Sequence, residues 1–286
     1  MSPVSPVSPV ITVVGGTGRL GTLLVPLLRA GGARVRVASR SGVVPPALAD
    51  EVDECVRADV REPTTLAAAL QGSDIVVSAV HGLGPAGRVS PQSVDHRGNV
   101  HLVDRAATEG AEVVLLSVVG ASPVGSELER AKWAAEEHLR GAGTPWTVVR
   151  ASAYRELWDE VLRRSAARDG RAVVLGHGEN PVNMVSMATV AQAVARACLD
   201  RSTRGQVLEV CGPQDVRLLD LARTASAPGC RPRHVSRPVL RALGQVARPV
   251  RPDLARLARL ALWMDTADLR HEDGTASTGY LTGDIR

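Results

Sequence analysis

Three glycines, spaced three residues apart, lie between the first apolar run and the first helical pattern of this 286-residue chain. The apolar run, VITVVGG (10–16), is rich in β-branched residues and is typical of a buried strand. The segment RLGTLLVPLLRAGG (19–32) has leucines at helical spacing and ends in two glycines, as helices often do. The chain therefore begins with a strand that turns through glycines into a helix.

The same alternation continues along the chain. Further strand patterns occupy 33–39, 54–57, 73–80, 111–120 and 144–152, with helical patterns between them at 63–72, 93–110 and around Lys132. Short connections between alternating strands and helices favour a parallel sheet with helices on both faces. A core of Val, Leu and Ala fits this arrangement, because phenylalanine is absent and aromatic residues make up 2% of the chain. We predict an α/β fold with a doubly wound parallel sheet, a Rossmann fold, and a smaller C-terminal lobe.

The glycine-rich turn reads Gly15-Gly-Thr-Gly18-Arg-Leu-Gly21. Without side chains the backbone can approach a pyrophosphate, whose charge is stabilised by the unpaired N–H groups and the positive dipole end of a helix. Between a first strand and a first helix, the pattern favours dinucleotide binding over a purely structural turn. The predicted phosphate-binding residues are Gly15, Thr17, Gly18, Arg19, Leu20 and Gly21.

The end of the second strand predicts which dinucleotide binds. An NAD site places a carboxylate there for the ribose 2′-hydroxyl, and a carboxylate would repel the 2′-phosphate of NADP. This chain has Ser39-Arg40-Ser41, with no acid before Asp50. Arg40, assisted by Arg19, could bind a 2′-phosphate, although two solvated surface arginines are the alternative. We predict NADP as the cofactor, with NADPH bound more tightly than NADH.

These motifs resemble the atypical short-chain dehydrogenase/reductases, the NmrA-like and isoflavone-reductase-like group, over roughly residues 10–215. The resemblance implies that Asp59 and Val60 lie beside the adenine and that SAV (78–80), with Ala79 and Val80, lies near the cofactor ribose. LLSVVGA (115–121) is similar to the end of the family's fifth strand, and WTVVRAS (146–152) is similar to the strand that leads into the substrate pocket. The segments 182–200 and 205–213 are similar to the lobe that closes over the substrate.

The family's usual catalytic group is Ser, then Tyr, three residues and Lys. Ser117 matches the serine and Lys132 the lysine, so the resemblance places both beside the cofactor and makes them candidate catalytic residues. Leu128 stands where the tyrosine would be. Tyr154, just after the WTVVRAS strand, is a candidate proton donor, although an isolated aromatic residue more often serves packing. His81, after the SAV strand end, is a further candidate for the cofactor site.

Lys132 is the only lysine among 34 basic residues. Glu129 and Glu136 are three and four residues away, so an exposed helical ion pair is one interpretation. An arginine would serve that purpose equally well. An ammonium group is compact and can lose its proton when desolvated, whereas a guanidinium stays charged and needs planar acceptors. The sequence therefore favours a place for Lys132 in the nicotinamide site.

Two functions follow from these residues. The first is an NADPH-dependent reductase that transfers hydride to a small carbonyl, enone or quinone. The second is a non-catalytic NADP(H)-binding redox sensor of the NmrA type, which signals through a protein partner. The missing tyrosine is compatible with both, so the sequence leaves open whether the protein is an enzyme.

The arginine-rich stretch from Arg223 to Leu260 has nine arginines and one acid. Within it, RPDLARLARLALW (251–263) predicts an amphipathic helix with Leu254, Leu257, Ala258 and Ala261 on one face. We interpret it as a helix docked on the core with a solvated arginine face, rather than a membrane or nucleic-acid contact. Few aromatic residues and no binding motif argue against nucleic acid.

The predicted organisation has three parts. Residues 1–9 are a disordered Ser-Pro-Val tail, 10–152 the NADP-binding core, and 153–286 the C-terminal part with the substrate lobe packed on the core. Four separated cysteines and no apolar run of about 20 residues indicate a cytoplasmic protein with reduced thiols. Cys230 and His234 are too few ligands for a metal site. A homodimer is possible.

Overall fold

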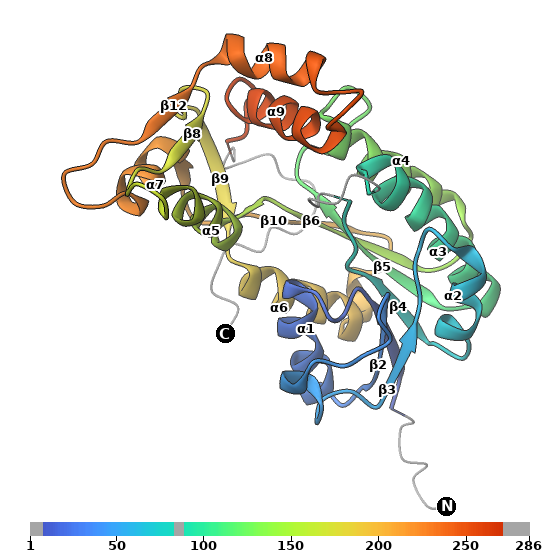
Figure 1. The fold of residues 1–286 in the computed structure, drawn as a ribbon. Coiled ribbons are helices and arrows are strands. Elements are labelled where there is room, and N and C mark those ends of the chain that lie inside the picture. The colour runs from blue at the N-terminus through green and yellow to red at the C-terminus, as the bar shows by residue number, and fades with distance from the viewer. Residues whose placement is uncertain (1–7, 83–88, 271–286) are drawn as a thin grey trace, which may run out of the picture.

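A seven-stranded, all-parallel sheet forms the centre of the molecule (Figure 1). The computed structural model describes residues 8–82 and 89–270, so most of the predicted tail lies outside the described residues. Neighbouring strands follow the order β10-β6-β5-β4-β1-β2-β3. The strands are β1 Val10–Val14, β2 Arg34–Ser39, β3 Glu54–Arg57, β4 Ile75–Ser78, β5 Glu112–Val118, β6 Trp146–Ala151 and β10 Val207–Val210. The predicted Rossmann fold is confirmed.

Two layers of helices cover the sheet (Figure 1). Leucines of α1 (Arg19–Ala30) and alanines and valines of α6 (Met187–Leu199) bury one face of it. On the other face lie α2 (Pro63–Leu70), α3 (Arg97–Glu109) and α4 (Glu127–Gly141). The two hydrophobic clusters contain aliphatic side chains almost exclusively, as expected for a core without phenylalanine.

The order of the strands reverses next to β1. The chain proceeds outward from β1 through β2 to β3 in one direction, and from β4 through β5 and β6 in the other. Connections after β1 and β4 therefore leave the sheet on opposite sides, and the crevice between them opens at the carboxyl ends of the strands. Ligands of doubly wound folds bind at this switch point.

The C-terminal lobe is built from small sheets and short helices. Its three-stranded sheet runs β11-β9-β7 and its two-stranded sheet β12-β8. The elements are β7 Ala153–Tyr154, α5 Arg155–Ala166, β8 Val173–Leu175, β9 Pro181–Val185, β11 Asp215–Arg217, α7 Leu218–Ala225, β12 Arg233–Val235, α8 Arg237–Val246 and α9 Pro252–Met264. The predicted boundary at residue 153 does not separate the two parts completely. The later elements α6 and β10 pack on the main sheet or belong to it.

The arginine-rich stretch forms the helix pair α8 and α9, which lies above the amino-terminal end of α4 in Figure 1. The predicted helix at 251–263 is confirmed, and Ala258 and Ala261 are buried as expected. The expectation for Leu257 is wrong: it is 48% exposed, because the contact face turns toward Ala255 and Met264. Arg256 donates to the Val89 carbonyl at 3.0 Å and so attaches α9 to the core.

A charged cluster lies beneath α4, around the fully buried carboxylate of Glu136. Glu136 accepts hydrogen bonds from the Ser117 hydroxyl at 2.5 Å and from the Arg150 guanidinium at 2.7 and 3.1 Å. Arg140 donates to it at 3.0 Å, and Arg150 continues to Glu209 at 3.3 Å. The cluster joins α4 to β5, β6 and β10, since these residues come from all four elements.

Removing the Glu136 carboxylate is expected to destabilise the fold strongly. In Glu136→Ala the guanidinium of Arg150, 19% exposed, loses its closest partner. Removing one partner of a buried ion pair costs about 3–5 kcal/mol. We expect urea unfolding to show a loss of that size in the free energy of unfolding.

The adjacent Glu137 offers the matched control, because its side chain is 50% exposed and pairs with the same Arg140. Glu137→Ala should cost less than about 1 kcal/mol, as exposed ion pairs do. Equal losses in the two variants would contradict the role assigned to the buried cluster.

Candidate functional site

The glycine-rich turn packs against the end of β4. Gly15 has φ +89°, and a Cβ at this position would lie 2.7 Å from the Ala79 carbonyl oxygen and 3.3 Å from a Val80 methyl. At Gly21 a Cβ would lie 2.3 Å from the Gly16 carbonyl oxygen. These contacts are with backbone atoms, which cannot move aside as a flexible side chain can. The turn therefore holds the first helix close to β1 and β4 at the switch point.

The start of α1 is open to a ligand. Gly18 is its N-cap, and no side chain caps the helix. The first N–H groups of a helix have no partner within it, so those of Arg19, Leu20 and Gly21 point toward the turn unpaired. Gly18 and Arg19 are exposed and Thr17 is half-buried, while Leu20 is buried and anchors the helix. This arrangement fits a pyrophosphate group at the turn.

Arg19 is held differently from the sequence expectation. Its guanidinium forms an ion pair with Glu160 of α5, a contact between the phosphate turn and the C-terminal lobe. The hydrogen bond from Arg19 is the main cause that lowers the pKa of Glu160. The carboxylate of Glu160 thus offsets part of the positive charge of Arg19. Arg40 therefore offers a phosphate more uncompensated positive charge than Arg19 does.

Arg40 lies at the carboxyl end of β2, where a 2′-phosphate is expected. It is exposed, and its guanidinium forms no ion pair with any carboxylate in the described part of the chain. The preceding Ser39 is buried; its hydroxyl lies 3.3 Å from that of Ser41 and accepts from the Gly42 N–H at 3.1 Å. Hydrogen bonds within the short turn after β2 therefore hold the backbone beside Arg40, while the side chain of Arg40 is exposed.

Asp59 and Val60 follow β3, next to the end of β2. Asp59 forms a chelated ion pair with Arg61, in which the closest atoms are 2.5 Å apart. Hydrogen bonds from Arg61, and to a smaller extent the charge of Arg40, lower the pKa of Asp59. Val60 is buried, and its carbonyl oxygen lies 2.9 Å from His101 Nδ1. The place of the pair beside the adenine stays a prediction from the family resemblance.

Lys132 is buried, so the interpretation as an exposed helical ion pair is wrong. Its side chain is 4% exposed, and Nζ lies 3.0 Å from Oδ1 of the fully buried Asp95. Nζ also donates to the carbonyl oxygens of Leu116 at 2.8 Å and Val80 at 3.2 Å. Glu129 instead caps α4 at Ser126. The ammonium group joins the residues at the carboxyl ends of β4 and β5.

A buried polar chain continues from Lys132. Asp95 lies on a π-helical turn, Gln92–His96, before α3, and its Oδ2 accepts from the Gly82 N–H at 2.7 Å. Asn99, four residues on, donates to the Asp95 carbonyl at 2.8 Å, and its Oδ1 accepts from Ser78 at 2.5 Å. π-Helical turns are frequent at functional sites. This one brings a carboxylate to the only lysine of the chain.

The remaining candidates lie in different surroundings. Ser117 is buried and donates to Glu136 beneath α4, so its hydroxyl is engaged away from the crevice. Tyr154 packs against the aliphatic cluster under α1 and α6, and no described residue forms a hydrogen bond with its phenol. Burial, followed by the charge of Glu156, raises the pKa of Tyr154 above its ordinary range. His81 is exposed and has a partner.

The structure adds residues that sequence reasoning missed, chiefly Asp95, Asn99, Glu136 and Glu160. Asp95 and Asn99 are four residues apart among buried Val94, Leu102 and Val103. Two polar residues at helical spacing on an otherwise apolar helix face could have indicated a buried polar pair. Nothing in the sequence connected Glu160 with Arg19, which are far apart along the chain.

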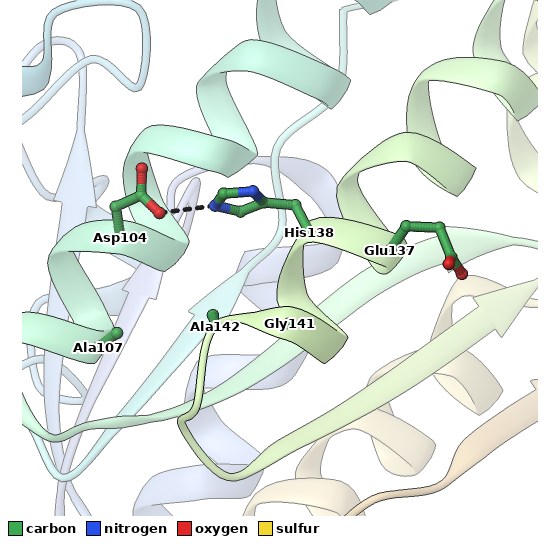
Figure 2. Close-up of a pocket in the computed structure, with 6 residues that line it drawn as sticks. All are labelled: Asp104, Ala107, Glu137, His138, Gly141 and Ala142. Atoms are coloured by element: carbon green, nitrogen blue, oxygen red, sulfur yellow. Dashed lines mark hydrogen bonds and ion pairs between the residues drawn. The ribbon is translucent and has the colours of Figure 1, made fainter.

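A surface hollow of about 400 Å³ lies between α3 and α4. Figure 2 shows Asp104 and His138 pointing toward one another across it, with Oδ1 and Nε2 2.6 Å apart. These residues belong to the ends of α3 and α4 that lead into the amino ends of β5 and β6. The hollow is therefore on the opposite edge of the sheet from the crevice, and it does not contribute to the candidate site.

Two further features bear on the kind of site. In residues 8–82 and 89–270, no three His, Cys, Asp or Glu side chains cluster as ligands for a metal ion. Over the same residues, no helix combines the length and the apolar character needed to cross a membrane.

The fold and the turn define a dinucleotide-binding protein of the Rossmann class. Residues 15–201, more than half of the chain, match the NAD(P)H-binding family. The chain belongs to this family, which confirms the predicted relationship at that level. A curated relative, the NAD(P)H azoreductase of Xenophilus azovorans, is 26% identical over 220 residues, covering 76% of this chain and 73% of the relative.

Solved structures show the same fold. A nucleoside-diphosphate-sugar epimerase from Staphylococcus aureus has a TM-score of 0.74 at 19% identity. Triphenylmethane reductase from Citrobacter sp., complexed with NADP(H), gives 0.72 at 20% identity. The NADPH-dependent quinone oxidoreductase from Escherichia coli, complexed with NADPH, gives 0.73 at 20% identity. Each comparison covers 92% of this chain and 92% of the other.

Gly15→Ala is expected to weaken cofactor binding beyond its effect on stability. The added methyl group meets the Ala79 carbonyl oxygen and must push the turn away from β4. Overpacking of 1–3 kcal/mol corresponds to a loss of roughly 5- to 150-fold in affinity. Calorimetric titration with NADPH measures this loss.

Gly32→Ala is the matched control. Gly32 has φ +84°, close to that of Gly15, but an added Cβ meets no atom within 4 Å. Both variants should lose stability from the strained backbone, about 1 kcal/mol or more. An equal loss of NADPH affinity in both would show that the contact with β4 does not shape the phosphate site.

Proposed function

We propose that the protein is an NADPH-dependent reductase. The observation that carries the proposal is the uncapped helix start at Gly18, packed between β1 and β4. The exposed Arg40 guanidinium, which pairs with no carboxylate of residues 8–82 and 89–270, lies at the end of the neighbouring β2. The first feature suits a pyrophosphate, and the second suits a 2′-phosphate. When bound, NADPH supplies a hydride.

The acceptor we propose is an aromatic or conjugated compound, with a quinone as the first candidate. The similar proteins reported above are named for reductions of azo compounds, triphenylmethane compounds and quinones, which share conjugated rings. Small carbonyl compounds and enones belong to the same proposal, because they accept hydride at an electron-poor carbon. The acceptor would lie where the C-terminal lobe meets the crevice.

Lys132 is proposed to position the cofactor site rather than to donate the proton. Its ammonium group is surrounded by Asp95 Oδ1 and the carbonyl oxygens of Val80 and Leu116, within 3.2 Å. Three acceptors around a tetrahedral cation match an ammonium group, whereas a planar guanidinium would not fit them. By holding the segments after β4 and β5 together, Lys132 would fix the walls of the nicotinamide pocket.

Tyr154 is the better candidate for the proton donor. Tyr154 closely follows β6, at the carboxyl edge of the sheet, and its phenol carries its proton at neutral pH, because burial raises its pKa. It also lacks a hydrogen-bond partner among the described residues, so the proton is not committed to a neighbour. Ser117 would act through Glu136 and not on the acceptor, since its hydroxyl already donates to that carboxylate.

One observation favours the redox sensor as the second candidate. Leu128 stands where the family's tyrosine would be, and the lone lysine is committed to internal contacts. A site without a proton donor could bind NADP(H) and report its occupancy to a protein partner without turnover. A cytoplasmic location and a homodimer remain parts of the proposal.

Arg40→Ala is expected to remove the preference for NADPH. The guanidinium interacts with the 2′-phosphate, which NADH lacks, and a charged hydrogen bond contributes about 1.5–3 kcal/mol. We expect NADPH affinity to fall roughly 10- to 150-fold while NADH affinity stays the same. Titration with both cofactors measures the two constants.

Arg34→Ala provides the control, since Arg34 is exposed at the amino end of the same strand. It should leave both affinities unchanged. Wild-type protein that binds NADPH and NADH equally well would contradict the predicted preference.

Tyr154→Phe is expected to lower kcat with little change in NADPH affinity. Loss of a general acid typically costs about 10²- to 10⁴-fold in rate. Because its pKa is raised, the wild-type phenol should cause no decline in rate up to at least about pH 10, the ordinary value for tyrosine. The measurement is NADPH consumption against quinones, enones, aldehydes and an azo dye, as a function of pH.

Lys132→Arg, assayed in parallel, separates the possible roles. We expect it to weaken NADPH binding and to lower the melting temperature, because the larger cation displaces the segments after β4 and β5. If Tyr154→Phe keeps full activity and Lys132→Arg binds NADPH but does not turn over, the amine is the proton donor instead. If the wild type binds NADPH and reduces no acceptor, the sensor is favoured.

A further inference from the structure

The C-terminal lobe contains a cavity of about 150 Å³ beside α5. Trp158, Val161 and Leu162 of α5 form one wall, and Leu218 of α7 with Ala261 and Met264 of α9 form others. Residues of β8 close its base. Val161, at 52% exposure, lies at its mouth, so the cavity communicates with solvent.

The residues that line the cavity are apolar apart from the Ser165 hydroxyl and the indole N–H of Trp158. Ser165 is its only hydroxyl-bearing residue, and its Oγ donates to the Leu162 carbonyl at 2.7 Å and accepts from the Val173 N–H at 2.9 Å. An ordered water needs two to four polar partners, and among these lining side chains only the Trp158 indole N–H is not engaged in a hydrogen bond that fixes it elsewhere. The space is therefore suited to an apolar group and unsuited to a charged one.

The volume corresponds to a single six-membered ring. Engineered apolar cavities of about 150 Å³ stay dry and bind benzene. The indole of Trp158 and the thioether of Met264 are groups that contact aromatic rings favourably. We propose that this cavity is a binding site for an apolar single-ring group.

The ring site is separate from the cofactor turn. Trp158, Val161, Leu162 and Ser165 recur at helical spacing and lie on one face of α5. Glu160 lies between them on the opposite face, where it pairs with Arg19 of the phosphate turn. A ring in the cavity and a cofactor at the turn would occupy opposite sides of one helix, so neither displaces the other.

Toluene is the probe for the experiment, and the readout is the melting temperature of the full chain. We expect toluene at about ten times its dissociation constant to raise the melting temperature by about 3 °C. Benzoate, of similar size but charged, should cause no rise, because a largely apolar cavity does not compensate a carboxylate for the loss of its water. The same rise is expected with NADPH present.

Ala261→Leu tests whether the cavity is the site, because the added carbons fill the space. It should remove most of the rise with toluene, while Ala242→Leu, the same change at an exposed position of α8, keeps it. If Ala261→Leu does not fold, Val161→Phe, at the half-exposed mouth, serves instead.

An absent rise in the wild type, or a rise that survives both cavity variants, would overturn the proposal. So would displacement of toluene by NADPH. None of these measurements uses an electron acceptor or turnover. The ring site can therefore fail while the reductase proposal stands, and the reverse also holds.

Discussion

One ammonium group, that of Lys132, connects four parts of the molecule at the carboxyl edge of the sheet. It belongs to α4, contacts the carbonyl oxygens of Val80 and Leu116 after β4 and within β5, and pairs with Asp95 on the π-helical turn. Removing a buried cation from water is costly unless acceptors surround it. The surrounding backbone is therefore fixed relative to the amine, and the shape of the crevice depends on this contact.

The second constraint is steric, and it acts on the other side of the crevice. Gly15 leaves no room for a side chain against Ala79, and Val80, the next residue, is the one whose carbonyl accepts from Lys132. The phosphate turn thus packs against Ala79, and Lys132 donates a hydrogen bond to the next residue after β4, Val80. A dipole-based site needs such rigidity, because unpaired N–H groups stabilise an anion only when they are held in place. The lone lysine and the glycine-rich turn therefore both fix the position of the segment that follows β4.

The fold could be predicted because it depends on local patterns. The strand at 54–57 and the start of α1 at Arg19 match the expected positions, since apolar periodicity and glycines specify them. The partners of the site residues could not be predicted in the same way. Asp95 reaches Lys132, and Glu160 reaches Arg19, through tertiary contacts that no spacing in the sequence encodes. Ser117 was matched by position, but which neighbour its hydroxyl meets depends on how α4 packs on β5.

The hydrophobic packing of the C-terminal lobe differs from that of the sheet core. Parallel strands and helices pack well with Val, Leu and Ala, as the two main clusters do. The lobe joins short helices and two small sheets, and its hydrophobic cluster combines aliphatic side chains with methionines and Trp158. The space beside Trp158 lies at a junction of this kind, where α5, α7, α9 and β8 meet. The proposed ring site thus lies in the lobe, where Trp158 is the aromatic side chain that lines the cavity, and outside the aliphatic core of the sheet.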